Sequence, residues 1–160
     1  MPAFDEKLFH ATTIALGEVA AMIVGPPGIG KSDLALRCLM MPAGPMSGDV
    51  AKLVSDDQTL LRLDGGQLIA SAPLTISGKL EVRGLGILEV VPQAFAKVAL
   101  VVALDGGVPE RLPKRPLATT QVMGVEVSRL ALSPFEMSAP AKLLLALANV
   151  MQFTVFNFDK

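Results

Sequence analysis

Eight residues, Gly25-Pro26-Pro27-Gly28-Ile29-Gly30-Lys31-Ser32, constrain the fold of this 160-residue chain more than any other segment. They fit the pattern Gly-x-x-x-x-Gly-Lys-Ser, in which glycines let consecutive backbone N–H groups converge on phosphate oxygens. The surroundings fit as well, because the apolar run Val19–Val24 indicates a strand before the loop and Ser32–Met40 a helix after it. The motif predicts a nucleotide-phosphate site, in which Lys31 reaches the β- and γ-phosphates and the Ser32 hydroxyl binds Mg²⁺.

The rest of the chain alternates apolar runs with turns. Turn signals at Leu16-Gly17-Glu18 and Asp64-Gly65-Gly66 predict two hairpins. The strands of these hairpins and two further buried strands are Leu8–Ala15, Val19–Val24, Thr59–Leu63, Gln67–Ser71, Lys52–Ser55 and Val98–Leu104. The last of these is the most hydrophobic and is expected in the middle of the sheet.

Three segments are expected to be loops: Met41–Asp49, Glu81–Ile87 and Val108–Leu117. Ala139–Phe153 has helical spacing and is expected to pack on the sheet. Strands, loops and helices alternate along the chain, and hairpins are mixed in. The sequence therefore predicts an α/β domain, a P-loop domain with a mixed β-sheet flanked by helices.

Composition limits the classes of partner. The chain has the length of one domain, and 51% of its residues are apolar, which is enough for a sizeable core. Its 14 Lys and Arg residues nearly balance 15 Asp and Glu residues, so no basic surface is expected for nucleic acid or an anionic membrane. The apolar runs are too short to cross a membrane, and Asp5 and Glu6 argue against a signal peptide. With a single cysteine, Cys38, expected as a small buried residue, the sequence predicts a cytoplasmic protein.

An enzyme that uses such a loop for phosphoryl transfer needs an acidic residue at a strand end, to hold Mg²⁺ or to take a proton. Asp56-Asp57 follows the predicted strand Lys52–Ser55, and Asp105 follows Val98–Leu104. The strand pattern favours Asp105, because the strand before it is the better central strand. Chemistry favours the pair, since two like charges in contact favour proton uptake by one of them. From the residues alone, both positions remain candidates.

Four groups of residues occur in the order in which HPr kinase/phosphorylase carries them: His10, the phosphate loop followed by Asp33-Leu34-Ala35-Leu36, Leu53-Val54-Ser55-Asp56-Asp57 and Glu81-Val82-Arg83-Gly84-Leu85-Gly86-Ile87. The last stretch matches the family signature and is more specific than the phosphate loop. The chain resembles the catalytic domain of this family over about residues 8–148, which implies an HPr kinase and PEP carboxykinase-like fold. The resemblance further implies one domain without the N-terminal regulatory domain of long members, similar to the short forms of alphaproteobacteria.

The resemblance also implies an activity and a site. The family uses ATP and Mg²⁺ to phosphorylate a serine of the phosphocarrier protein HPr, in regulation of the phosphotransferase system, and many members remove that phosphate with inorganic phosphate. By resemblance, Asp57 is the general base for the serine hydroxyl and the general acid in reverse, with Asp56 helping at the metal or at Asp57. Glu81 joins Ser32 at Mg²⁺. The remaining active-site residues implied are His10 on the strand before the loop strand, Arg83, and Arg111, which stabilises the transferring charge.

Two stretches depart from the family pattern. The loop Met41–Asp49 is longer than the usual connection. Where the family has a basic loop linked to dephosphorylation, this chain has Leu132-Ser133-Pro134-Phe135-Glu136-Met137-Ser138-Ala139-Pro140, with no Lys or Arg between Arg129 and Lys142. The sequence therefore predicts much stronger kinase than phosphorylase activity. Two alternatives stay open: a P-loop kinase for another acceptor, and a non-catalytic ATP-sensing regulator. Long relatives form hexamers, so the resemblance leaves a homo-oligomer open, although the sequence itself carries no interface signature.

Overall fold

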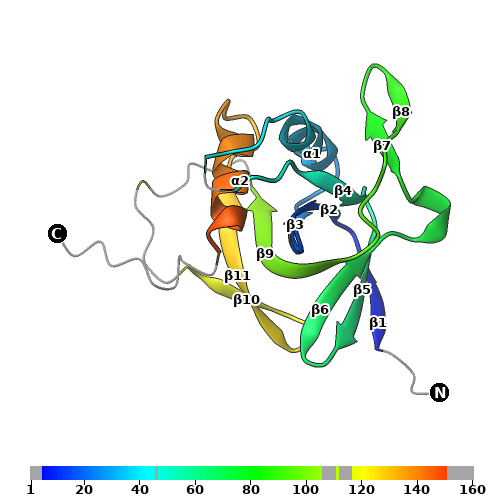
Figure 1. The fold of residues 1–160 in the computed structure, drawn as a ribbon, viewed down its shortest axis with the longest axis vertical. Helices are drawn as coiled ribbons and strands as arrows, with labels where there is room; N and C mark the ends of the chain where they lie inside the picture. Colours follow the sequence, from blue (N-terminus) through cyan, green and yellow to red (C-terminus); the bar gives the residue numbers. More distant parts are fainter. Residues whose placement is uncertain (1–4, 46, 106–110, 112–116, 151–160) are drawn as a thin grey trace.

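A large mixed sheet forms the centre of the computed structural model, which describes residues 5–45, 47–105, 111 and 117–150 (Figure 1). Its strands, as far as these residues go, are β1 (Glu6–Phe9), β2 (Thr12–Leu16), β3 (Val19–Val24), β4 (Lys52–Ser55), β5 (Thr59–Asp64), β6 (Gln67–Ser71), β9 (Ala96–Leu104), β10 (Thr119–Val122) and β11 (Val125–Leu132). Their order is β1-β5-β6-β9-β3-β2-β4, with β11 also paired to β9, and β10 paired to β11. The other elements are a two-stranded sheet, β7 (Lys79–Val82) with β8 (Gly86–Glu89), a 3-10 helix over Leu74–Ile76, and the helices α1 (Lys31–Leu39) and α2 (Ala139–Ala148).

The large sheet is built around β9. This strand is buried along most of its length, as expected for a strand with neighbours on both edges, and its predicted central position is confirmed. β9 runs parallel to β3 and β11 and antiparallel to β6. In its register with β3, Ala103 lies opposite Val24, so the phosphate loop begins beside the end of β9. A Cβ on Gly25 would lie 2.9 Å from the carbonyl oxygen of Leu104, which is why a glycine is required there.

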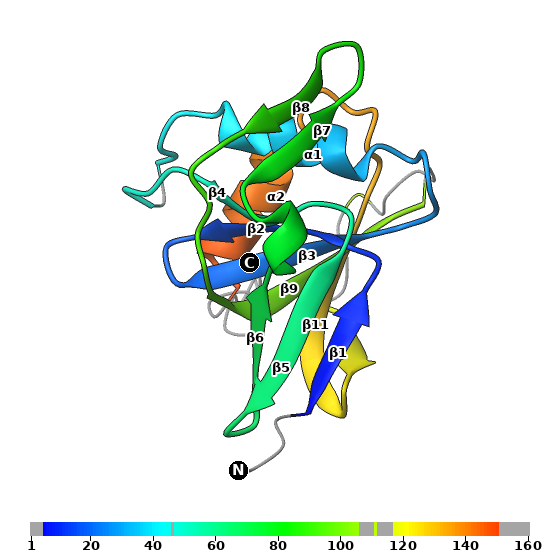
Figure 2. The same ribbon diagram turned by 90° about the vertical axis from the view of Figure 1, so that its right-hand side faces the viewer.

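Both described helices cover one face of the large sheet, while the sheet curls over its own other face (Figures 1 and 2). On the helix face, Leu34 of α1 and Leu143 of α2 pack in one cluster with Ile23 of β3. Met22, the preceding residue of β3, points to the opposite face and packs in a second cluster with Leu61 of β5. The predicted α/β class with a mixed sheet is confirmed.

Cys38 of α1 is buried in the core cluster that α1, α2 and the sheet share, as predicted. Burial raises the pKa of its thiol to about 12, and the positive charge of Arg37 opposes that rise. The thiol therefore stays protonated and unreactive at neutral pH, which suits a packing role.

The predicted strand over residues 8–15 is wrong in one respect, because the structure divides it into two strands. β1 pairs with β5, whereas β2 pairs with β3 and β4. The chain changes partners at His10 and Ala11, where the hydroxyl of Thr59 donates a hydrogen bond of 2.9 Å to the Ala11 carbonyl. His10 therefore lies at the bend between two strands and not on a strand.

The predicted loop over residues 81–87 is also corrected, because β7 and β8 form a hairpin that projects beyond the large sheet (Figure 2). Burial alternates along β7, and Leu80 packs against Leu53 of β4. The backbone N–H of Val90 donates a hydrogen bond of 2.8 Å to the Gly78 carbonyl and closes the base of the hairpin. Turn glycines within so short a hairpin make its sequence look like a loop.

The predicted helix over residues 139–153 is shorter in the structure. α2 ends at Ala148, because the side chain of Asn149 donates a hydrogen bond of 2.8 Å to the Leu145 carbonyl and caps the last turn. Residues 151–153 lie outside the described part of the chain. The same holds for most of the predicted loop over residues 108–117. No element was predicted where β10 and β11 form a hairpin beside β9.

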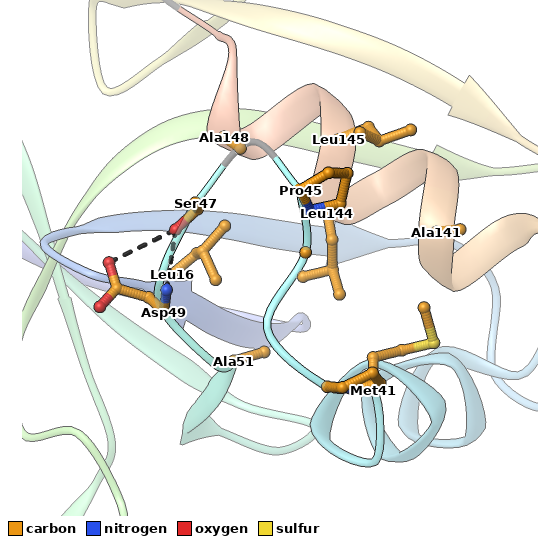
Figure 3. Close-up of a pocket in the computed structure, with 12 residues that line it drawn as sticks. Leu16, Met41, Pro45, Ser47, Asp49, Ala51, Ala141, Leu144, Leu145 and Ala148 are labelled. Carbon is orange, nitrogen blue, oxygen red and sulfur yellow. Dashed lines mark hydrogen bonds between the residues drawn. The ribbon is translucent and has the colours of Figure 1, made fainter.

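The long loop after α1 packs beside α2 (Figure 3). Its irregular conformation was predicted over residues 41–49 and is confirmed for all of them except Met46, which is not described. An apolar pocket of about 140 Å³ lies between the loop and α2. The residues from outside the loop that line this pocket are Leu16, Ala51, Ala141, Leu144, Leu145 and Ala148.

We expect Gly78→Ala to destabilise the hairpin of β7 and β8. Gly78 has a φ of +72°, and a Cβ there would lie 2.8 Å from the Val90 carbonyl oxygen. The free energy of unfolding, measured by urea denaturation, should fall by about 1–3 kcal/mol. Gly48→Ala is the control, because no described atom lies within 4 Å of its Cβ position and its φ is not positive. Equal losses in the two variants would contradict the strain at Gly78.

Candidate active site

The phosphate-binding loop, residues 25–32, connects β3 to α1 as the sequence predicts. Lys31 is the first residue of α1, and only 6% of it is exposed. Its ammonium reaches back over the loop and donates hydrogen bonds of 3.0 Å to the Gly25 carbonyl and 3.1 Å to the Pro26 carbonyl. An ammonium has three donor hydrogens, so one remains for a phosphate oxygen.

The carboxylate of Asp56 connects three elements behind this loop. Its Oδ1 accepts hydrogen bonds from the Ser32 hydroxyl at 2.6 Å and the Thr12 hydroxyl at 3.0 Å. Its Oδ2 accepts a hydrogen bond of 3.0 Å from the backbone N–H of Glu81. Asp56 is buried, and all three partners are donors, which is the pattern that an ionised carboxylate requires.

Asp57 is exposed to solvent, unlike the buried Asp56, because its backbone adopts a left-handed conformation. Its φ is +64°, an uncommon conformation for a residue other than glycine that aspartate tolerates better than most. The backbone N–H of Asp57 donates a hydrogen bond of 3.1 Å to Thr12 Oγ1. Its carboxylate is 63% exposed and lies 3.3 Å from His10 Nε2. Strained backbones of this kind are common at functional sites, and here the strain turns the carboxylate outward.

A cleft of about 400 Å³ brings most of the predicted site residues together. Its lining residues are Gly28, Ile29, Gly30, Lys31, Ser32, Asp33, Leu36, Asp57, Glu81, Val82, Arg83 and Phe135. Asp56 lies directly behind the cleft through its bond to Ser32, and His10 lies beside Asp57. The hairpin of β7 and β8 thus carries Glu81 and Arg83 to the side of the phosphate loop.

Two other predicted candidates are placed differently. Asp105 is exposed at the end of β9 and is not among the described residues that line the cleft. Arg111 is exposed, its sequence neighbours lie outside the described residues, and it too is absent from the described lining. Of the two acidic elements that the sequence left open, Asp56-Asp57 contacts the phosphate loop through the hydrogen bond between Asp56 and Ser32.

Sequence reasoning missed two residues at the site. Thr12 is fully buried and binds both aspartates, but within an apolar run nothing distinguishes it from an ordinary core threonine. Phe135 lines the cleft from the loop between β11 and α2, where only the charges of the sequence were considered. Thr12 and Phe135 are both far in sequence from the site residues that they lie beside, so no local sequence pattern indicates their role.

The donors present fit Mg²⁺. The hydroxyl of Ser32 and the carboxylate of Glu81 line the cleft and are oxygen ligands of the kind that this ion prefers, while Asp56 bonds the Ser32 hydroxyl from behind. No three His, Cys, Asp or Glu side chains among the described residues converge as a complete metal site. Phosphoryl-transfer enzymes usually hold Mg²⁺ with one or two carboxylates, waters and the phosphates of the substrate.

A strand, a glycine-rich loop and a helix that face a buried carboxylate define a P-loop domain of the kinase type. The chain belongs to the HPr Serine kinase C-terminal domain family, whose model matches residues 4–137. The resemblance inferred from the sequence is thereby confirmed. None of the described helices is long and apolar enough to cross a membrane.

Curated relatives and a solved structure agree with this family. The chain is 37% identical over 95 residues to the HPr kinase/phosphorylase of Clostridium tetani, a match that covers 56% of this chain and 28% of that protein. It is 30% identical over 129 residues to the HPr kinase/phosphorylase of Brevibacillus brevis, covering 74% of this chain and 39% of that protein. The chain thus spans well under half the length of these relatives. The structure of the Hpr(Ser) kinase/phosphatase from Coxiella burnetii has the same fold, with a TM-score of 0.71, 24% identity and coverage of 93% of this chain and 98% of that one.

We expect Thr12→Val to weaken Mg²⁺-ATP binding, because Asp56 loses one of the donors that hold it against Ser32. The loss should be about tenfold, the equivalent of one hydrogen bond, measured by calorimetric titration. Thr12→Ser keeps the hydroxyl and should bind Mg²⁺-ATP with the wild-type affinity. Thr13→Val is the matched control, since Thr13 is equally buried but its hydroxyl bonds Thr59, 2.8 Å away. Equal losses of affinity in Thr12→Val and Thr13→Val would show a general effect on folding and not an effect on Asp56.

Proposed function

We propose that this chain is an ATP- and Mg²⁺-dependent protein-serine kinase that phosphorylates HPr. The observation that carries the proposal is the position of Asp57, whose exposed carboxylate shares one cleft with Lys31 and Ser32 of the phosphate loop. The names of the relatives, HPr kinase/phosphorylase, support HPr as the acceptor and a nucleotide as the phosphoryl donor, and we propose ATP as that nucleotide.

The phosphate loop would bind the donor. Its backbone N–H groups and the ammonium of Lys31 hold the β- and γ-phosphates of ATP at the start of α1. Ser32 and Glu81 would hold Mg²⁺, with Asp56 fixing the position of the Ser32 hydroxyl. When bound, Mg²⁺ neutralises charge on the phosphate oxygens.

Asp57 would act as the general base. It accepts the proton of the HPr serine hydroxyl as the serine oxygen attacks the γ-phosphorus and ADP leaves. His10, 3.3 Å away, would orient the Asp57 carboxylate. Arg83 lines the cleft and can bind the transferring phosphoryl group through charge-assisted hydrogen bonds. We propose the same role for Arg111 on the family resemblance alone, since it is not among the described lining residues.

We further propose that the forward kinase reaction dominates. Phosphorolysis brings inorganic phosphate, a phosphoserine and Asp57 into one site, so cations must offset their mutual repulsion. The loop between β11 and α2 supplies Glu136, and the nearest downstream cation, Lys142, lies 2.5 Å from that carboxylate. Lys142 is therefore already paired and offers little net positive charge to a second phosphate.

A cytoplasmic location suits a kinase for a phosphocarrier protein, and we retain it as part of the proposal. Assembly into homo-oligomers, which the resemblance to long relatives leaves open, stays a prediction.

The kinase assignment predicts phosphoserine on HPr after incubation with the protein and Mg²⁺-ATP, detected by mass spectrometry. Asp57→Asn should lower the turnover about a hundredfold to ten-thousandfold and leave ATP affinity nearly unchanged, because only the proton acceptor is lost. Asp105→Asn is the control and should turn over at nearly the wild-type rate. If the effects of these two variants were exchanged, Asp105 would be the proton acceptor. Tight ATP binding without any phospho-HPr would indicate another acceptor or a regulator without catalysis.

The charge of the loop before α2 predicts slow phosphorolysis. Serine-phosphorylated HPr, Mg²⁺ and millimolar phosphate should yield pyrophosphate at least about tenfold more slowly than the forward reaction consumes ATP. Glu136→Lys adds the missing positive charge and should raise the ratio of phosphorolysis to kinase activity. Comparable forward and reverse rates in the wild-type protein would show that a basic loop is not needed.

A further inference from the structure

The loop between β11 and α2, residues 133–138, is tied to α1 on both sides of one aromatic residue. Arg37 Nη2 donates a hydrogen bond of 2.5 Å to the Pro134 carbonyl, and Nη1 donates one of 3.3 Å to the Glu136 carbonyl. Its Nε bonds Asp33 Oδ2 at 3.0 Å, which fixes the guanidinium on the surface of α1. Phe135 lies between the two anchored carbonyls, so its backbone position is held.

Phe135 is nevertheless 78% exposed. Phe135 lines the same cleft as the phosphate loop, and a Cβ on Gly30 would lie 3.8 Å from Pro134, the residue before it. An exposed aromatic side chain on an anchored loop can bury its ring against a ligand with little loss of conformational freedom. The arrangement is that of a prepared binding surface.

The cleft offers both kinds of surface that a nucleotide contacts. Lys31, Ser32 and Glu81 supply polar groups for phosphates, while Leu36, Val82 and Phe135 add apolar surface. Leu36 lies about one helical turn beyond Ser32 on α1, and Arg37 attaches the loop of Phe135 to the same part of the helix. A nucleotide whose phosphates bind at the start of α1 would therefore extend its base along this part of the helix, toward Phe135.

We propose that Phe135 is the stacking platform for the base of the bound nucleotide, and that Arg37 is the positioning residue that holds the platform. The inference rests on nucleotide binding by the phosphate loop, which is part of the proposed function, but not on transfer to HPr. Leu36, Val82 and Phe135 have no side-chain hydrogen-bonding groups, and stacking accepts any purine. The platform therefore binds adenine and guanine with similar strength.

A tryptophan at the platform provides a direct readout, because the natural sequence has no Trp and no Tyr. In Phe135→Trp, Mg²⁺-ATP and Mg²⁺-GTP should both quench the indole fluorescence. Mg²⁺-tripolyphosphate should bind by calorimetry without quenching it, since it has no base. Unchanged fluorescence at saturating ATP, with binding verified by calorimetry, would overturn the assignment.

Phe135→Ala tests the energetic role without an introduced reporter. ATP affinity should fall about tenfold, within the range for loss of one base-stacking contact, while tripolyphosphate affinity stays at the wild-type value. The unchanged tripolyphosphate affinity also shows that the phosphate loop and the fold are intact. Met137→Ala is the control, because Met137 is 96% exposed two residues along the same loop and does not line the cleft. It should leave ATP affinity unchanged, and a loss equal to that of Phe135→Ala would overturn the assignment.

Arg37→Ala tests the positioning role. ATP affinity should fall as in Phe135→Ala with tripolyphosphate affinity retained, and Phe135→Ala added in the Arg37→Ala background should cost little more. Fully additive losses would overturn the positioning role of Arg37.

The alternative ligand for the ring is the acceptor protein. If Phe135→Ala raised the KM for HPr and left ATP affinity unchanged, the ring would serve acceptor docking and the base assignment would be overturned. All the expected readouts concern nucleotide binding. A protein that shows them but yields no phospho-HPr would retain the platform and refute the kinase assignment.

Discussion

The carboxylate of Asp56 accepts hydrogen bonds from three parts of the chain that are far apart in sequence. Ser32 donates from α1, Thr12 from β2, and the backbone of Glu81 from β7. A hydrogen bond to a charged group contributes about 1.5–3 kcal/mol, so three of them offset the several kcal/mol that removing a carboxylate from water costs. The consequence is geometric. This one carboxylate fixes the phosphate loop, the large sheet and the hairpin of β7 and β8 relative to one another. The cleft lies between them.

The two adjacent aspartates have different surroundings because the chain turns between them. Asp56 follows β4 directly and is buried, while Asp57 adopts a left-handed conformation and lines the cleft. The backbone N–H of Gln58 donates a hydrogen bond of 2.7 Å to the Asp56 carbonyl, which closes the turn and starts the chain toward β5. One residue therefore holds the site together and its neighbour is free to meet a substrate. A β-branched residue at position 57 would be strained in this conformation, whereas aspartate is tolerated.

The parts of the site that were predictable from the sequence are those coded by contiguous residues. The phosphate loop follows from its glycines and Lys31, and the central strand from its unbroken apolar run. The choice between Asp56-Asp57 and Asp105 was not decided by local pattern, because each follows a buried strand, and only the family resemblance favoured the pair. Thr12 and Arg37 act across 44 and 97 or more positions of sequence, so no spacing rule could identify them. The bend at His10 was missed for the same reason, since a change of strand partner leaves no mark in an apolar run.

Both walls of the cleft are attached to α1, the helix whose first turn carries the phosphate-binding residues. On one side, the bonds from Arg37 hold the loop of Phe135. On the other, Leu36 packs in the small cluster with Leu80 of β7, while Asp56 joins Ser32 to the backbone of Glu81. Because these contacts form on folding, the conformational entropy of the cleft walls is already lost before a ligand binds. Ordering the walls therefore does not weaken the affinity for the ligand.

The tip of the hairpin of β7 and β8 differs from these anchored walls. Leu85 and Ile87 are 76% and 68% exposed, so the wall that carries Glu81 and Arg83 is anchored at its base and ends in apolar surface beside the site. Anchored walls suit a small ligand such as a nucleotide, and apolar surface at the rim suits a larger one such as an acceptor protein, which has to reach Asp57 from outside.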